Sequence, residues 1–435
     1  MIISHLSLLL GIIIVYSTAI PVSNVMSSSV ISMKGTEKSS TWMLAAFVSG
    51  TALGYALCQF RASSFPFNKD NNKKTAESHL WKLVEYSLSS TMIRVADRLD
   101  LFEHLYQLGP ITSQNLAEKM GFSERWLREL LLQLAASGVC HYDAFHRTFS
   151  IQPEYATFLR DPSKEKKSIV AIFQFLSALV PRGDAVVQAV QTGKGIDYDF
   201  PSPEDVGTAL DRKNGNFFRH ILVDDVLTKI KIPATGESLY RKLEEGTTVA
   251  DIGCGFGTST VALALRFPKS QFYAYESSPK ALQAIEENIK AANVSNVTVC
   301  NVEQRTLGDG PDLNDPSSRF GFVYAHDVLH DMLNPKELIK DVKKRLASDG
   351  CWFIVDIDCS EKVEENLRLP NAPMLYAFSC LLCLSMATSE SHGEGLGTCG
   401  FPPKLAEMWM RKAGFQYFEQ RKIPALPYNA CYLVA

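Results

Sequence analysis

A run of three alternating glycines constrains this 435-residue chain more than any other feature. Residues 247–260, TTVADIGCGFGTST, begin as a short apolar strand rich in β-branched residues and then reach Gly253, Gly255 and Gly257. Glycine lets the backbone turn tightly where a Cβ atom would collide with a ligand. The pattern after the loop is helical, so we expect the unpaired N–H groups of a helix N-terminus to face that ligand.

Two carboxylates decide which ligand this loop suits. A dinucleotide-binding loop needs a third glycine at position 258, where this chain has Thr258. Glu276 ends a second predicted strand, residues 271–275, and a carboxylate at that place can bind both hydroxyls of a ribose. Asp251, just before the first glycine, suits a cationic amino-acid group better than a phosphate. A nucleoside is therefore favoured over a pyrophosphate, and a glycine turn without a ligand is the alternative.

At this point the segment resembles motifs I and II of the class I S-adenosylmethionine-dependent methyltransferases. The resemblance implies S-adenosylmethionine as the cofactor, held at the carboxyl edge of a Rossmann-like sheet. In that family a carboxylate placed like Glu303 often holds the adenine amino group, although an ordinary loop carboxylate is the alternative there. The cofactor contacts implied in this chain are Asp251, Gly253, Cys254, Gly255, Gly257, Glu276, Ser277, Glu303, His326 and Asp327.

Strand and helix patterns alternate through the C-terminal half of the chain. This alternation predicts an α/β domain with a parallel sheet, whose strand C-termini and ligand loops gather at one edge. An antiparallel hairpin closes the sheet, as in class I methyltransferases and unlike nicotinamide-binding folds. The seven predicted strands are residues 247–252, 271–275, 297–300, 320–325, 352–357, 417–422 and 428–434.

His330 is the predicted centre of the chemistry. A hydroxyl that accepts a methyl group must lose a proton, and imidazole titrates near neutrality. The run Leu329-His330-Asp331 is similar to the His-Asp motif of plant-type small-molecule O-methyltransferases. The resemblance makes His330 the candidate general base and Asp356, at the end of the fifth strand, the carboxylate that orients it; Asp331 completes the catalytic set. Met332 stands where that family usually has an aromatic residue, and a structural histidine that caps the next helix is the alternative.

Two cysteines lie close together on an apolar stretch, SCLLCLSMA, which contains Cys380 and Cys383. As a pair they lack the ligands of a zinc site, so we expect core thiols and no metal. A reactive thiol pair, of the kind that arsenic methyltransferases use, is the alternative.

Residues 75–161 are predicted to form a mostly helical, winged-helix-like domain. A short helix at 110–121 and a second helix that Ser123 begins precede a hairpin at 138–151. This order suits either DNA binding or a dimerisation domain of the kind found in small-molecule methyltransferases. Downstream segments resemble methyltransferases with an N-terminal winged helix, and that resemblance covers about residues 77–435.

Charge argues against nucleic acid as a partner. The chain has a net charge of −3, and on the second helix Glu124 and Glu129 offset Arg125 and Arg128. We therefore expect no nucleic-acid binding and consider a homodimer through the N-terminal helical domain.

Residues 162–238 are predicted as a helical connector or substrate lid. An apolar helix at 173–190 and an aromatic loop at 193–200 would either wall a substrate pocket or pack between the two domains. The apolar run at 376–386 also favours a lipophilic acceptor.

Residues 1–74 are predicted as a signal or membrane anchor and a linker. Residues 2–20 are nearly all apolar, which suits a cleaved signal, a signal anchor or an upstream extension. Residues 42–60 are free of charge and long enough for a transmembrane helix. Basic residues after this run, with the unpaired cysteines, predict a single-pass protein whose catalytic domain is cytosolic.

The predicted function is methyl transfer from S-adenosylmethionine to a small, lipophilic or aromatic hydroxyl acceptor. The catalytic domain is predicted to begin at residue 239 and to end at residue 435. Transfer to nitrogen, carbon or sulfur is an alternative, in which His330 would position the acceptor. A protein that keeps the nucleoside pocket but regulates a partner is the alternative from another class.

Overall fold

The computed structural model describes residues 69–202, 204–302, 307, 315, 318–390 and 392–435. The chain divides into two compact units, Met1–His79 and Leu80–Ala435, and the sites described below lie in the second. The predicted signal at 2–20 and the predicted span at 42–60 lie outside the described residues. Within the described residues no helix is long and apolar enough to cross a bilayer, and this finding corrects the predicted single-pass membrane location.

The first folded region is a winged helix-turn-helix. Its helices are α3 (Lys69–Arg98), α4 (Leu101–Leu108), α5 (Ser113–Met120), α6 (Glu124–Ala136) and α7 (Pro153–Leu159). Its strands β1 (Ile111–Thr112), β2 (His141–Asp143) and β3 (Thr148–Ser150) form an antiparallel sheet in the order β1-β3-β2. Helix α3 starts inside the stretch predicted to be a linker.

Local chemistry explains the two short helices of this region. The Thr112 side chain caps α5 by accepting the N–H of Asn115 at 3.2 Å, and Gly121 ends α5 with a φ of 70°. Ser123 stands at the N-cap of α6, but its side chain accepts no cap hydrogen bond from the described residues. Leu116, Leu131 and other apolar side chains of α4, α5 and α6 bury one shared core with β3.

The connecting region is helical with interruptions, as predicted. It contains α8 (Ala171–Leu179), η2 (Val180–Arg182), α9 (Gly183–Thr192), α10 (Val206–Phe217), η3 (Phe218–Val226), η4 (Leu227–Lys229) and α11 (Leu239–Glu245). The apolar helix predicted at 173–190 is divided at η2, which contains a proline. The buried Arg182 guanidinium donates to the carbonyl oxygens of Asp197 and Tyr198, and so holds the aromatic loop in place.

The C-terminal region contains one seven-stranded sheet, which confirms the predicted strand number. The strands are β4 (Thr248–Ile252), β5 (Gln271–Glu276), β6 (Val297–Asn301), β7 (Phe320–His326), β8 (Leu346–Ile357), β9 (Phe418–Arg421) and β10 (Asn429–Val434). They lie in the order β6-β5-β4-β7-β8-β10-β9, and only β10 pairs antiparallel, with both β8 and β9. Strand β8 is longer than predicted because Leu346 also pairs with Phe320 of β7, with a register shift between this pair and the pair of Phe322 and Cys351.

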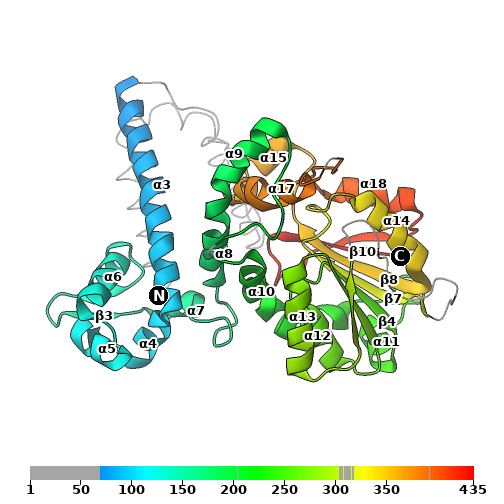
Figure 1. Ribbon diagram of the computed structural model, residues 1–435, viewed down its shortest axis with the longest axis horizontal. Coiled ribbons are helices and arrows are strands. Elements are labelled where there is room, and N and C mark those ends of the chain that lie inside the picture. Colours follow the sequence, from blue (N-terminus) through cyan, green and yellow to red (C-terminus); the bar gives the residue numbers. More distant parts are fainter. Residues whose placement is uncertain (1–68, 203, 303–306, 308–314, 316–317, 391) are drawn as a thin grey trace, which may run out of the picture. The chain divides into compact units, whose positions relative to one another are not determined.

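Helices cover both faces of this sheet (Figure 1). On one face, α11 and α12 (Thr258–Arg266) pack with η3 against buried side chains such as Val249 and Phe353. On the other face, α14 (Pro335–Arg345) and α18 (Pro403–Ala413) pack over Ile252 and Trp352. The remaining helices are α13 (Pro279–Ala292), α15 (Val363–Asn366), α16 (Ala372–Phe378), η6 (Ser379–Cys383) and α17 (Leu384–Ala387).

Helices α16, η6 and α17 follow one another without a break, and η6 is a wide π-helical turn. Cys383 is the last residue of that turn and is buried. Such turns are often found at functional sites, because the extra residue changes where side chains point.

Candidate active site

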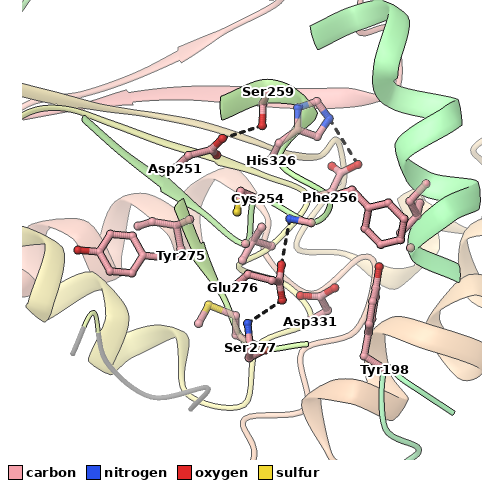
Figure 2. Close-up of a pocket in the computed structure, with 18 of the residues that line it drawn as sticks. Tyr198, Asp251, Cys254, Phe256, Ser259, Tyr275, Glu276, Ser277, His326 and Asp331 are labelled. Carbon is pink, nitrogen blue, oxygen red and sulfur yellow. Dashed lines mark hydrogen bonds and ion pairs between the residues drawn. The ribbon is translucent and has the colours of Figure 1, made fainter. Parts of the chain in front are cut away.

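A cavity lies at the carboxyl edge of β4, β5 and β7, where a parallel sheet collects its ligand loops. Its wall combines the glycine loop with the ends of the neighbouring strands and with side chains of α10 and the aromatic loop (Figure 2). The predicted cofactor residues found in this wall are Asp251, Gly253, Cys254, Gly255, Glu276, Ser277, His326 and Asp327. Glu303, predicted to hold the adenine amino group, lies outside the described residues.

The glycine loop needs glycine for two different reasons. Gly253, Gly255 and Gly257 all have a positive φ, at 63°, 57° and 73°, where other residues are strained. A Cβ atom on Gly253 would lie 2.6 Å from the Val328 side chain, whereas one on Gly255 would meet no described atom within 4 Å. The loop at Gly255 therefore faces open space in the cavity. Gly257 begins α12 and is not part of the cavity wall.

Glu276 ties the end of β5 to the glycine loop. Its carboxylate accepts the backbone N–H of Gly255 at 2.9 Å, of Ser277 at 2.7 Å and of Ser278 at 3.0 Å, and Figure 2 shows the bond to Ser277. Burial raises the pKa of Glu276, and these three backbone donors oppose that rise. A carboxylate offers about four acceptor sites, so capacity remains for a ligand hydroxyl.

Asp251 lies at the end of β4 and is buried. Its Oδ2 atom accepts hydrogen bonds from the hydroxyls of Ser259 and Thr260, each at 2.6 Å. Burial raises the pKa of Asp251 to about 6, although the two hydroxyls oppose the rise. The carboxylate is therefore ionised at neutral pH, and its Oδ1 atom remains available to a cation.

His326 and Asp327 end β7 in a fixed arrangement. The Nδ1 atom of His326 lies 2.7 Å from the Tyr324 hydroxyl, and its ring packs against Phe218. Asp327 has a φ of 54° and accepts a hydrogen bond from Asn429 at 2.8 Å. Burial lowers the pKa of His326, so this ring is neutral at the pH where the carboxylates of the site are charged.

The predicted catalytic residues lie beside the cavity. The Nδ1 atom of His330 is 2.7 Å from Oδ1 of Asp356, and both side chains are buried behind the cavity wall. Burial opposes the charged imidazole, but Asp356 and the Cys383 side chain outweigh it and raise the pKa of His330 well above its usual range. Asp331 does line the cavity, and burial raises its pKa to about 7.

Comparison with known proteins agrees with this geometry. A family model described as a methyltransferase domain matches residues 250–352, and an Rv2258c-like winged HTH domain matches residues 87–160. The chain carries a class I methyltransferase domain behind a winged-helix domain. This confirms the family predicted from the glycine loop, and S-adenosylmethionine is its cofactor.

Solved structures with the same fold match this chain over nearly the whole of their own length. An O-methyltransferase family protein from Burkholderia thailandensis is 18% identical, with a TM-score of 0.57 over 82% of this chain and 97% of its own. Human N-acetylserotonin methyltransferase, solved with S-adenosylmethionine, is 15% identical, with a TM-score of 0.54 over 85% of this chain and 99% of its own. At these identities the likeness establishes the fold.

Curated relatives of the methyltransferase domain match over shorter stretches. (S)-coclaurine N-methyltransferase of Papaver somniferum is 27% identical over 113 residues, which are 26% of this chain and 30% of that protein. Ribosomal RNA small subunit methyltransferase G of Flavobacterium johnsoniae is 27% identical over 33% of this chain and 66% of its own. The chain thus spans between about a third and two thirds of the length of these relatives.

The methyltransferase cavity fits S-adenosylmethionine on its own geometry. Gly255 leaves room for a ligand against the backbone, and Glu276 places a carboxylate where a ribose would lie. Asp251 would hold a charged oxygen ready for the amino group of the methionine part. When bound, the cofactor supplies an electrophilic methyl group on a sulfonium sulfur.

Other wall residues of the methyltransferase come from regions with no recognisable motif. Asp211 and Asn214 reach the cavity from α10, and the Thr258 hydroxyl donates to Asp211. The sequence gives no sign of them, because α10 is distant in the chain and has an ordinary helical pattern. Tyr198 belongs to the loop predicted as a possible pocket wall, and Met386 to the apolar run at 376–386. The predicted helix 173–190 contributes none of the described wall residues.

Proposed function

We propose that this chain transfers the methyl group of S-adenosylmethionine to the hydroxyl of a small acceptor, with His330 as the general base. The observation that supports this proposal is the buried pair of His330 and Asp356, 2.7 Å apart, beside the cofactor cavity. Methyl transfer is an in-line displacement, so the protein must mainly hold donor and acceptor at a reactive distance. A hydroxyl acceptor must also lose its proton, and the base serves that step.

The pair favours one proton arrangement. In the neutral ring, which forms at a pH above the raised pKa of His330, Asp356 accepts the Nδ1 proton and the lone pair on Nε2 can remove a proton from an acceptor. The imidazolium formed in this way is stabilised by the Asp356 carboxylate. The proton of the hydroxyl thus moves to Nε2 while its oxygen takes the methyl group and the sulfonium becomes a neutral thioether.

The acceptor proposed is lipophilic or aromatic. Beyond the cofactor residues, the cavity wall includes the apolar side chains of Met332, Leu333, Phe218 and Met386. Apolar pockets with few polar groups are typical of sites for small organic ligands. Met332, which replaces the family's usual aromatic residue, leaves a flexible side chain in this wall.

Transfer to nitrogen is the second candidate, and Asp331 favours it. A carboxyl group in the cavity wall can hold a protonated amine. Under this alternative His330 would position the acceptor and would not remove a proton. The two candidates predict different acceptors for one site.

The test is a transfer assay on the full chain with labelled S-adenosylmethionine and a panel of matched phenols and amines. We expect methylated phenols from the wild-type chain and a loss of transfer in the His330→Gln variant, with cofactor binding retained in calorimetry. Methylated amines that survive His330→Gln would favour the second candidate. Cofactor binding without transfer to any acceptor would favour the alternative that the chain is a non-catalytic protein, which binds the cofactor and regulates a partner.

The partner proposed for the N-terminal helical domain is a second copy of the chain. Leu80, Val84 and Leu88 repeat every four residues along α3 and are 61%, 47% and 62% exposed. Apolar stripes of this kind mark protein interaction surfaces. Nucleic acid remains an unexpected partner, because Arg125 pairs with Glu129 at the surface of α6.

A further inference from the structure

Three side chains of different chemistry meet beside the cofactor cavity. His330, Asp331 and Cys383 each offer one ligand atom, and these atoms lie within 4.8 Å of one another. His330 and Asp331 follow β7, whereas Cys383 ends the π-helical turn η6, more than fifty residues later. A metal site at Cys383 therefore takes its other ligands from His330 and Asp331, and not from the nearby Cys380.

The orientation of His330 suits a metal ligand. Asp356 holds the Nδ1 atom at 2.7 Å, so Nε2 is the nitrogen left for a metal. A carboxylate behind a ligating histidine fixes the ring and makes it a better donor. The backbone N–H of Ile357 donates to the same Asp356 oxygen at 2.7 Å and holds that carboxylate in place.

The donor set selects the class of ion. One imidazole nitrogen, one thiolate and one carboxylate oxygen suit Zn²⁺ or Co²⁺, whereas Mg²⁺ and Ca²⁺ prefer oxygen ligands. Tetrahedral Zn²⁺ with bonds of about 2.0 to 2.3 Å places its ligand atoms roughly 3.5 Å apart. The three ligand atoms lie within 4.8 Å of one another, so side-chain rotations that move each atom by about 1 Å bring them to the spacing of a tetrahedral zinc site. Three protein ligands leave the fourth position open.

We propose that His330, Asp331 and Cys383 bind one zinc-type ion, and that this ion and the general-base step exclude each other. The second half rests on the proposed function of His330. Binding forms a bond from each of the three ligand atoms to the metal, and the protons that these atoms carry, on the Cys383 thiol, on Nε2 of His330 and on the Asp331 carboxyl, leave to solvent. The Nε2 lone pair that would accept the proton of a hydroxyl is then shared with the metal.

The position of Asp331 places this site at the cavity. Asp331 is one of the cavity wall residues, and so is Met386, which follows Cys383 in α17. An ion held by Asp331 therefore lies at the cavity wall. We expect it to leave the contacts of Glu276 and Asp251 with the cofactor unchanged, since those residues are not among its ligands.

Cobalt titration of the full, chelator-treated chain tests the ion site. Co²⁺ bound by a thiolate has a charge-transfer absorption that Co²⁺ in water lacks, and Zn²⁺ should displace it. The Cys383→Ser variant should lose this absorption and bind Zn²⁺ at least about 100-fold more weakly. Cys380→Ser is the matched control, because Cys380 lies on the same π-helical turn but is exposed, and it should keep the absorption.

Two results would overturn the ion site. One is the absence of the absorption from the wild-type chain; the other is its persistence in Cys383→Ser. Loss of cofactor binding would show that Cys383→Ser fails to fold, and the Asp331→Asn variant is then the test. This variant should keep the thiolate absorption but bind Zn²⁺ about tenfold or more weakly. Unchanged Zn²⁺ affinity in Asp331→Asn would overturn the site as well.

The exclusion is tested separately from the ion site. Zn²⁺ at saturation should lower the transfer rate about 100-fold, the size of a general-base contribution, and a chelator should restore it. An equal rate with and without bound Zn²⁺ would overturn the exclusion and leave the ion site standing. A chain that binds Co²⁺ and S-adenosylmethionine but methylates no acceptor would instead remove the proposed function, and the exclusion with it.

Discussion

His330 and Asp356 form a buried hydrogen-bonded pair with 2.7 Å between Nδ1 and Oδ1, and their side chains are 3% and 0% exposed. They are 26 residues apart in the chain: His330 follows β7, and Asp356 lies near the end of the adjacent parallel strand β8. The sheet therefore brings them together at its carboxyl edge. A buried carboxylate with one fixed imidazole partner sets the tautomer of the ring.

The Asp356→Asn substitution should slow methyl transfer between about 100- and 10,000-fold. An amide in place of the carboxylate removes the charge that stabilises the imidazolium and can hold the ring in the wrong tautomer. Cofactor affinity should change little, since Asp356 is not part of the cavity wall. The measurement is the transfer rate at saturating acceptor, together with calorimetry of S-adenosylmethionine binding.

The winged-helix region offers a matched control for this pair. The Nδ1 atom of His146 lies 2.6 Å from Asp143 Oδ2, but both side chains are exposed. Asp143→Asn should leave transfer unchanged. A similar loss in both variants would mean that general destabilisation, and not the base, explains the effect at Asp356.

Glu276→Gln should weaken S-adenosylmethionine binding about 10- to 100-fold, the size of one hydrogen bond to a charged group. The side chain keeps its shape, but the amide also brings donors toward the N–H groups of Gly255, Ser277 and Ser278. Glu287→Gln, at a residue on α13 that bonds only Gln283 among the described residues, is the control. An affinity equal to that of the wild type would remove Glu276 from the cofactor site.

Cofactor affinity should fall as the pH drops below about 6. Burial raises the pKa of Asp251 to about 6, so the free protein gains a proton there below that pH and loses the charge that attracts the ammonium group. The dissociation constant should then rise about tenfold for each further pH unit. Calorimetry between pH 5 and pH 8 measures this, with circular dichroism as the check on folding; a flat profile would contradict the assignment.

The same carboxylate should make the cofactor-free protein less stable at neutral pH. The folded state holds the Asp251 proton up to about pH 6 and the unfolded state only up to 3.8, so stability falls as the pH rises between these values. The cost is up to about 3 kcal/mol above pH 6. Asp251→Asn removes that charge, so it should raise the melting temperature of the cofactor-free protein by a few degrees at pH 8. At pH 4 the melting temperature should not change, because Asp251 is already protonated in the folded state. The same variant should bind the cofactor more weakly.

Most of this fold can be predicted from the sequence, because most strands and helices are marked by local residue patterns. The strand that ends at Ile252 and the strand that ends at Glu276 are apolar runs stopped by glycine or by a polar residue, and both were predicted within two residues. The length of β8 was missed, because the residues before Gly350 are mostly polar and the strand is extended by the pairing of Leu346 with Phe320 of β7 across a register shift. Pairing across strands leaves no periodic pattern in the chain.

The residues of the candidate site also divide into those that local patterns predict and those that they do not. His330, Asp356 and Glu276 lie at or just after the carboxyl ends of strands, where a motif and the edge rule for parallel sheets predict that they gather. Asp211 enters the cavity from α10, and Cys383 reaches His330 from a π-helical turn, and neither contact follows from a local pattern. Only the packing of helices against the sheet edge determines those neighbours.

The apolar stripe of α3 should hold two copies of the chain together. Leu80, Val84 and Leu88 lie on one face of the helix at a spacing of four residues, and each has about half or more of its surface exposed. Burying these side chains against the same stripe of a second chain would contribute roughly 25 cal/mol for each Å² removed from water. We expect a dimer in sedimentation analysis of the wild-type chain.

Charged residues in that stripe should separate the two copies. Leu80→Glu together with Leu88→Glu places like charges opposite one another in a symmetric pair, so this variant should sediment as a monomer with its helical content and cofactor binding intact. Phe145→Glu is the matched control, because Phe145 is 89% exposed on the hairpin between β2 and β3 and lies away from the stripe in sequence. A wild-type monomer, or a dimer that survives both substitutions in α3, would show that this face does not join two copies.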